Sequence, residues 1–227
     1  NKGTMRIHAK IITIFKHMKI GIVREGKIPI DKRVALIPEH AAQLKDKFKC
    51  EIVVQSSAIR AISDEEYVRH GIDLQQDLSD CDVLFGVKEV PIHDLIQSKT
   101  YFFFSHTYKQ QPYNAKLLRA CVERNIRLID YELLKKNGTR VVAFGRFAGL
   151  VGAYNGLRGW AEKYGQFVLK PAHECHDMQD MFDQLKGIDW PADLRILLTG
   201  KGRVAGGAVE TLKAAGIPEI APEDVEN

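Results

Sequence analysis

Charged side chains that could move a proton follow two of the chain's apolar segments. Lys88 comes directly after the strand predicted over residues 82–87, and His106 follows the strand predicted over 101–104. A lysine among other cations and apolar walls acts as a base when its pKa is lowered. A histidine titrates near neutrality and exchanges protons with such a base. Lys88 and His106 are therefore candidate catalytic residues.

Two arginines and two glutamates stand at similar positions. Arg33 follows the first predicted strand, Glu89 follows Lys88, Glu132 follows a strand over 126–129, and Arg140 opens another. A guanidinium binds a carboxylate with two hydrogen bonds. Each residue alone also fits a solvated strand end or a surface charge. Open α/β sheets place ligands at the carboxyl ends of their strands, so the joint placement favours a substrate site.

The elements that must position these side chains alternate between strand and helix patterns. Strands are predicted over residues 18–23, 51–54, 82–87, 101–104, 126–129 and 140–144. Helices are predicted from residue 38, over 63–71, from residue 91 and over 115–122. Continuous apolar strands that alternate with helices indicate a parallel sheet covered on both faces. The sequence therefore predicts an α/β fold.

A glycine loop follows a further apolar run over 194–199. Gly200, Gly202 and Ala205 fit the pattern GxGxxA, and a helix is predicted from Val204 to Ala215. Glycines allow a tight turn and close approach to a pyrophosphate, which the helix N-terminus then stabilises. The order of strand, loop and helix favours a dinucleotide site. A structural glycine turn in any βα unit is the alternative.

The chain after this loop is short for a nucleotide-binding domain. A second strand is predicted over 217–220, and Glu223 or Asp224 would then accept the ribose hydroxyls. A βαβ unit takes roughly 30 residues, and a full dinucleotide fold needs two larger halves. From the start of the loop to the end of the sequence, only residues 200–227 are available for this domain. We therefore expect an incomplete second domain.

Composition excludes several classes of protein. The 227 residues are 45% hydrophobic and 27% charged, with a net charge of +4, which excludes disordered, collagen-like and disulfide-scaffold chains. No apolar run approaches the roughly 20 residues that cross a bilayer, and no basic stripe indicates a nucleic-acid partner. The four cysteines form no CxxC motif, which favours a reducing, cytoplasmic location. The cluster His173-Glu174-Cys175-His176 contains side chains that bind zinc. It is interpreted as a polar linker and not as a metal site, because closed zinc sites need four ligands.

The domain organisation follows from these patterns. Residues 1–17 contain no acidic residue; a basic start of this kind fits a transit peptide, but a tag or misassigned start is favoured. Gly149, Gly152, Gly156 and Gly159 predict a closely packed crossing helix. Residues 1–17 are predicted to be a leader or tag, and residues 18–163 a substrate and catalytic domain. Residues 164–192 are predicted to be a linker, and residues 193–227 the start of an NAD(P)-binding domain.

Three segments carry a specific resemblance. Residues 101–111, 126–132 and 140–149 resemble the lysine-forming saccharopine dehydrogenases. They are equally similar to the lysine–2-oxoglutarate reductase half of the bifunctional aminoadipic semialdehyde synthases. The segment Arg33–Pro38 near the start of the predicted fold is also similar to the wider superfamily of alanine dehydrogenases and transhydrogenase alpha subunits. The resemblance implies two Rossmann-like domains with the active site in the cleft between them.

The resemblance also implies roles for individual residues. Lys88 matches the catalytic base and His106 the acid. The positions that match substrate contacts are Arg33, Arg140 and Phe144, with Glu89 and Glu132 tuning the charge of the site. The positions that match the cofactor side are Gln111, Gly202 and Arg203, beside Gly200 in the glycine loop. Thr139 departs from the pattern, because some members carry a second arginine there.

The implied activity is that of an NAD(P)-dependent oxidoreductase acting on the C–N bond of saccharopine. Its cofactor is NAD or NADP, and its partner is a small amino-acid or 2-oxo-acid substrate. Neither nucleic acid nor membrane is expected as a partner, and the chain is a monomer or a homo-oligomer. One alternative is an alanine dehydrogenase-like amino-acid dehydrogenase. Another is a non-catalytic binding module with the same fold.

Overall fold

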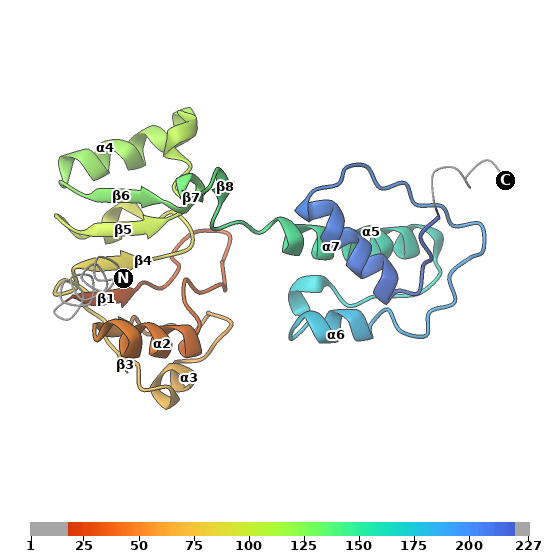
Figure 1. The fold of residues 1–227 in the computed structure, drawn as a ribbon, viewed down its shortest axis with the longest axis horizontal. Coiled ribbons are helices and arrows are strands. Elements are labelled where there is room, and N and C mark those ends of the chain that lie inside the picture. The colour runs from red at the N-terminus through yellow and green to blue at the C-terminus, as the bar shows by residue number, and fades with distance from the viewer. Residues whose placement is uncertain (1–17, 221–227) are drawn as a thin grey trace, which may run out of the picture. The chain divides into compact units, whose positions relative to one another are not determined.

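The computed structural model describes residues 18–220 and divides the chain into two compact units, Asn1–Val142 and Ala143–Asn227 (Figure 1). The predictions for residues 1–17, for Glu223 and for Asp224 lie outside the described residues. The predicted domain boundaries at 163/164 and 192/193 stay predictions.

A parallel sheet of six strands forms the centre of the first unit. The strands are β1 (Lys19–Ile22), β2 (Glu51–Val54), β3 (Asp73–Leu74), β4 (Val83–Phe85), β5 (Thr100–Phe103) and β6 (Arg127–Asp130). Their order across the sheet is β3-β2-β1-β4-β5-β6, that of the doubly wound dinucleotide folds (Figure 1). The predicted α/β class is confirmed. The short β3 was not predicted, because two residues carry no readable pattern.

Helices cover both faces of this sheet. They are α2 (Pro38–Phe48), α3 (Asp64–Arg69) and α4 (Ala115–Glu123). Successive strand residues point to opposite faces, so Ile52 belongs to the core cluster that includes residues of α2 and α3, while its neighbour Val53 belongs to the cluster that includes residues of α4. Four 3-10 turns lie in the connections of this unit: Ile92–Asp94, Thr107–Lys109, Pro112–Asn114 and Tyr131–Leu133.

The strand predicted over residues 140–144 is wrong. Thr139–Arg140 form β8, which pairs antiparallel with β7 (Lys135–Lys136) in a separate hairpin. Asn137 and Gly138 form the turn with φ of +51° and +76°, and such Asn-Gly turns favour two-residue hairpins. The apolar residues that follow leave the hairpin instead of entering the sheet, and Val141 is 62% exposed.

Two glycines bring helices into close contact in the second unit. Its helices are α5 (Gly145–Tyr164), α6 (Met178–Asp183) and α7 (Arg203–Ala214), with a 3-10 turn at Ala172–Glu174. A Cβ at Gly149 would lie 1.9 Å from the carbonyl oxygen of Val204, and a Cβ at Gly207 would lie 2.0 Å from that of Arg146. The predicted close crossing is confirmed for Gly149, with α7 as the partner of α5. It is wrong for Gly152, Gly156 and Gly159, where a Cβ would meet no described atom within 4 Å.

The strands predicted over 194–199 and 217–220 are wrong. No strand occurs between residues 143 and 220, and Leu197 is 90% exposed. A strand needs a neighbour for its backbone N–H and C=O groups, and the described part of this unit offers none. Within residues 18–220, no helix combines the length and apolar character needed to cross a membrane.

Candidate active site

The candidate site lies at the carboxyl edge of the first unit's sheet. Strands β4, β5 and β6 are parallel neighbours, so their carboxyl ends meet at one edge. Lys88 and Glu89 follow β4, His106 follows β5, and Glu132 follows β6. The topology therefore brings to one edge residues that the sequence places up to 44 positions apart (132 − 88).

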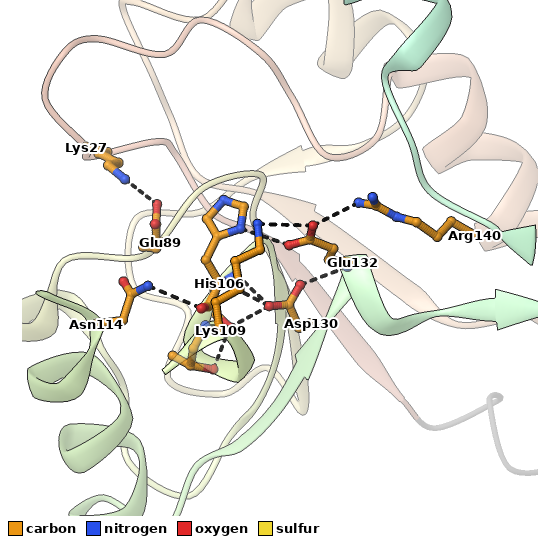
Figure 2. Close-up of polar contacts among 10 residues, drawn as sticks. Lys27, Glu89, His106, Lys109, Asn114, Asp130, Glu132 and Arg140 are labelled. Atoms are coloured by element: carbon orange, nitrogen blue, oxygen red, sulfur yellow. Dashed lines mark hydrogen bonds and ion pairs between the residues drawn. The ribbon is translucent and has the colours of Figure 1, made fainter. Parts of the chain in front are cut away.

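His106 and Glu132 form the central contact of the site. The Nδ1 atom of His106 lies 2.9 Å from Oε2 of Glu132, whose side chain is 10% exposed. The other oxygen of Glu132 lies 3.3 Å from Nζ of Lys109 and 3.3 Å from Nη2 of Arg140. Figure 2 shows His106 and Arg140 approaching this carboxylate from two sides. The structure thus brings together three of the predicted residues and adds Lys109.

The charge of Glu132 is stabilised by its neighbours. Burial raises the pKa of its carboxyl, but hydrogen bonds with His106 and Lys109 and the charge of Lys109 outweigh burial and hold the pKa below its ordinary value. Glu132 is therefore ionised at neutral pH and accepts a hydrogen bond from the Nδ1–H group of His106. A ring that donates through Nδ1 leaves Nε2 facing away from Glu132 as its second nitrogen.

The backbone of Lys88 is held by Glu25, which the sequence did not single out. One oxygen of Glu25 lies 2.7 Å from the N–H of Val87, and the other lies 2.8 Å from the N–H of Lys88. Burial raises the pKa of Glu25 although these hydrogen bonds oppose the shift. Glu25 is the first acid after β1, and its bonds tie the loop after β1 to the end of β4.

The remaining substrate-side residues are also paired with opposite charges. Oε2 of Glu89 lies 2.5 Å from Nζ of Lys27, while its Oε1 is buried without a hydrogen-bond partner among the described residues. Arg33 binds Asp31 through Nε at 2.9 Å and Nη2 at 2.5 Å. The hydrogen bond from Arg33 lowers the pKa of Asp31, and the charge of Lys88 acts in the same direction. Lys27 and Asp31 were not predicted.

Comparison with known proteins identifies the family. Residues 21–151 match the family described as "Alanine dehydrogenase/PNT, N-terminal domain". The chain belongs to this family. Its parallel sheet and the site at the sheet's carboxyl edge lie within the matched residues, apart from the first two residues of β1.

Several curated relatives resemble the chain within this family. The mitochondrial alpha-aminoadipic semialdehyde synthase of Bos taurus is 43% identical over 221 residues, which is 89% of this chain and 24% of the relative. The saccharopine dehydrogenase [NAD(+), L-lysine-forming] of Neurospora crassa is 32% identical over 204 residues, 84% of this chain and 55% of the relative. The chain thus spans about a quarter of the semialdehyde synthase and about half of the dehydrogenase. The resemblance predicted from the sequence is confirmed, whereas a cytoplasmic location stays a prediction.

A solved transhydrogenase from Sinorhizobium meliloti shares the fold. It superimposes with a TM-score of 0.50 at 22% identity, covering 60% of this chain and 40% of that protein. At this identity the likeness establishes the fold alone.

The predicted cofactor residues of this family member lie apart in the chain. Gln111 is exposed in the first unit, before the turn at Pro112–Asn114. Gly200, Gly202 and Arg203 lie at the start of α7 in the second unit. Phe144, which was predicted to lie beside the substrate, precedes α5 in the same unit. Their roles stay predictions.

The start of α7 fits a diphosphate. Gly200 has a φ of +95°, which glycine adopts without strain, and Gly202 is the N-cap without a side-chain cap. The helix has twelve residues, and the N–H groups of its first turn have no partner within the helix. A Cβ at either glycine would meet no atom of residues 18–220 within 4 Å. N–H groups at a helix N-terminus are suited to the diphosphate of a dinucleotide.

The cluster at residues 173–176 has no metal-binding geometry. His173 and His176 are strongly exposed and lie near the neighbouring acids Glu174 and Asp177. Within residues 18–220, no group of three or more His, Cys, Asp or Glu side chains is arranged to hold a metal ion.

Proposed function

We propose that this chain carries the catalytic residues of an NAD(P)-dependent oxidoreductase that acts on the C–N bond of saccharopine. The reaction releases lysine and 2-oxoglutarate, or condenses them in the reverse direction. The observation that carries the proposal is the contact of His106 with the buried, ionised Glu132 at the sheet edge that also holds Lys88. The similarity to the Neurospora dehydrogenase supports the choice of substrate.

Lys88 and His106 divide the proton transfers. A nicotinamide cofactor, held by Gly200, Gly202 and Arg203, would supply the hydride acceptor that converts the C–N bond of the substrate to an imine. Lys88 then removes a proton from the water that attacks this imine. His106 then shuttles a proton through Nε2 from the carbinol hydroxyl to the leaving nitrogen, so that the carbinolamine collapses to a ketone and an amine. Glu132 stabilises the imidazolium that forms whenever His106 holds two protons.

The arginines orient the substrate and do not take part in proton transfer. Saccharopine carries carboxylates, which guanidinium groups bind with two hydrogen bonds. The Nε of Arg140 is buried and has no hydrogen-bond partner among the described residues, so it is a donor to which a carboxylate can bind. Oε1 of Glu89 is the matching acceptor for an amine. Arg33 is proposed to complete the substrate site of the first unit, and a substrate contact by Phe144, which lies in the second unit, stays a prediction.

The cofactor is proposed to bind through the glycine loop. Gly200, Gly202 and Arg203 would hold the diphosphate at the start of α7. Roles for Gln111 and Glu223 in binding the cofactor stay predictions. The cofactor is NAD or NADP, and an acid at Glu223 would favour NAD.

A turnover assay on the protein at its natural length tests the proposal. We expect lysine-dependent oxidation of NADH or NADPH in the presence of 2-oxoglutarate. Lys88→Met and His106→Gln should each lower kcat by about 100-fold or more. Lys99→Met, at the opposite end of β5, is the matched control and should leave kcat unchanged.

The same assay separates the alternatives. Turnover with pyruvate and ammonia, but not with lysine and 2-oxoglutarate, would identify an alanine dehydrogenase-like enzyme, which the family match includes by name. A folded protein that turns over neither pair of substrates and does not bind NADH would be a non-catalytic module.

A further inference from the structure

We propose that Asp130 is the positioning residue of the candidate site. Its buried carboxylate holds His106 in the backbone conformation that keeps the imidazole on Glu132. The importance of this role rests on the proposed function, because it assumes that His106 transfers protons. The contact geometry of Asp130 itself does not depend on the reaction.

Asp130 joins the segments that follow two strands. It is the last residue of β6 and is 6% exposed. Its Oδ2 accepts hydrogen bonds from the N–H of His106 at 2.9 Å, the N–H of Ser105 at 3.2 Å and the hydroxyl of Ser105 at 2.7 Å. Its Oδ1 accepts the N–H of Glu132 at 2.8 Å. One carboxylate therefore fixes the backbone of both members of the His106–Glu132 pair (Figure 2).

The conformation of His106 requires such an anchor. Its φ is +55°, in the left-handed region that residues with a Cβ seldom adopt. The carbonyl of His106 is held as well, by the side-chain amide of Asn114 at 3.2 Å and the N–H of Lys109 at 3.1 Å. If φ returned to negative values, the Cα–Cβ bond would turn and the imidazole would leave Glu132. The hydrogen bonds on both sides of His106 oppose this rotation.

The charge of Asp130 suits this role better than a neutral amide would. All four of its contacts are donors, and a carboxylate offers only acceptors. In Asp130→Asn the new NH2 group must face at least one of these donors. With the carbonyl oxygen towards Ser105 and His106, the NH2 group opposes the N–H of Glu132. Nearly isosteric replacement should therefore displace Glu132 while preserving the fold.

NMR of ¹⁵N-histidine-labelled protein tests the proposal without relying on activity. In the unaltered chain we expect a protonated, hydrogen-bonded Nδ1 of His106, assigned by its loss in His106→Gln. In Asp130→Asn we expect this signal to weaken or disappear. Asp64→Asn is the matched control, because Asp64 also accepts a backbone N–H, from Ser57, and a serine hydroxyl, from Ser56. The His106 signal should be unchanged in that control.

Kinetics of the natural-length enzyme give a second readout. Asp130→Asn should lower kcat per folded active site by up to about 100-fold, with KM nearly unchanged, because displacement of a catalytic group impairs the transition state more than binding. An unchanged His106 signal in a folded Asp130→Asn variant would overturn the proposal, as would an equal loss in Asp64→Asn. If the unaltered enzyme lacks saccharopine turnover while the NMR result holds, the proposed function fails and the positioning role stands.

Discussion

Replacement of Glu132 by glutamine should lower the free energy of unfolding of the first unit and leave that of the second unit unchanged. Glutamine keeps the length of the side chain and one carbonyl oxygen but removes the charge that His106, Lys109 and Arg140 surround. Lys109 and Arg140 are 39% and 40% exposed, so water screens them and their contribution is small. The contact with His106 at 2.9 Å is more buried, and a hydrogen bond to a charged group contributes about 2 kcal/mol. We therefore expect a loss of about 2 kcal/mol.

Hydrogen exchange is the assay that isolates this effect. Backbone amides of β5 and β6 report opening of the first unit, and a loss of about 2 kcal/mol speeds their exchange by about 30-fold. Both tryptophans, Trp160 and Trp190, lie in the second unit, so their fluorescence should be the same in Glu132→Gln and the unaltered chain. Glu210→Gln removes an exposed partner of Arg146 in the second unit and should leave exchange in β5 and β6 unchanged.

The difference in the free energy of unfolding between the unaltered chain and Glu132→Gln should depend on pH. The folded-state pKa of Glu132 lies below its ordinary value of 4.5, so its charge stabilises the fold fully above that value. This stabilisation is lost as the pH falls through the lower pKa of the folded state, where the unaltered side chain becomes neutral like glutamine. A difference below about 0.5 kcal/mol at neutral pH, or one that does not shrink well below pH 4.5, would refute the reasoning.

Three further substitution and labelling experiments follow from the packing. Gly207→Ala places a Cβ 2.0 Å from a backbone carbonyl of α5 and should cost at least about 1–3 kcal/mol, seen as an earlier tryptophan unfolding transition. Its control, Gly206→Ala, meets nothing within 4 Å and should stabilise α7 by up to about 1 kcal/mol. Gly138→Ala forces φ of +76° on a side chain and should loosen the β7–β8 hairpin by about 1 kcal/mol, measured by amide exchange at Val141. Iodoacetamide should label the partly exposed Cys175 before Cys81, because burial raises the pKa of Cys81 to about 12; faster labelling of Cys81 would contradict its burial.

The sheet of the first unit was predictable because its strands are buried on both faces. A strand such as Glu51–Val54 is apolar along nearly its whole length, and turn or helix signals bound it on both sides. The order of the strands was not predictable, since it depends on which neighbours pair in space. The apolar run over 194–199 shows that composition alone does not establish a strand. Its residues suit a strand, but no strand of the described second unit pairs with it.

Side chains of the candidate site could be singled out from the sequence where their type is recognisable. His106 and Glu132 stood out for that reason, together with the family resemblance. Glu25 and Asp130 did not, because they act on backbone N–H groups 62 and 24 residues away, and no spacing pattern encodes such bonds. An acid at the end of an apolar strand was the available signal for Asp130, but it also fits an ordinary strand end.

The charge pairing of the site limits the ligands that suit it. Glu132 is balanced by Arg140 and its neighbours, and Glu89 is balanced by Lys27, so the site has no large excess of either charge. Two buried atoms have no hydrogen-bond partner among the described residues: a donor on Arg140 and an acceptor on Glu89. Leaving either atom unpaired in a closed site costs about 1–3 kcal/mol. The proposed amino-acid substrate carries a carboxylate that could pair with the donor on Arg140 and an amine that could pair with the acceptor on Glu89.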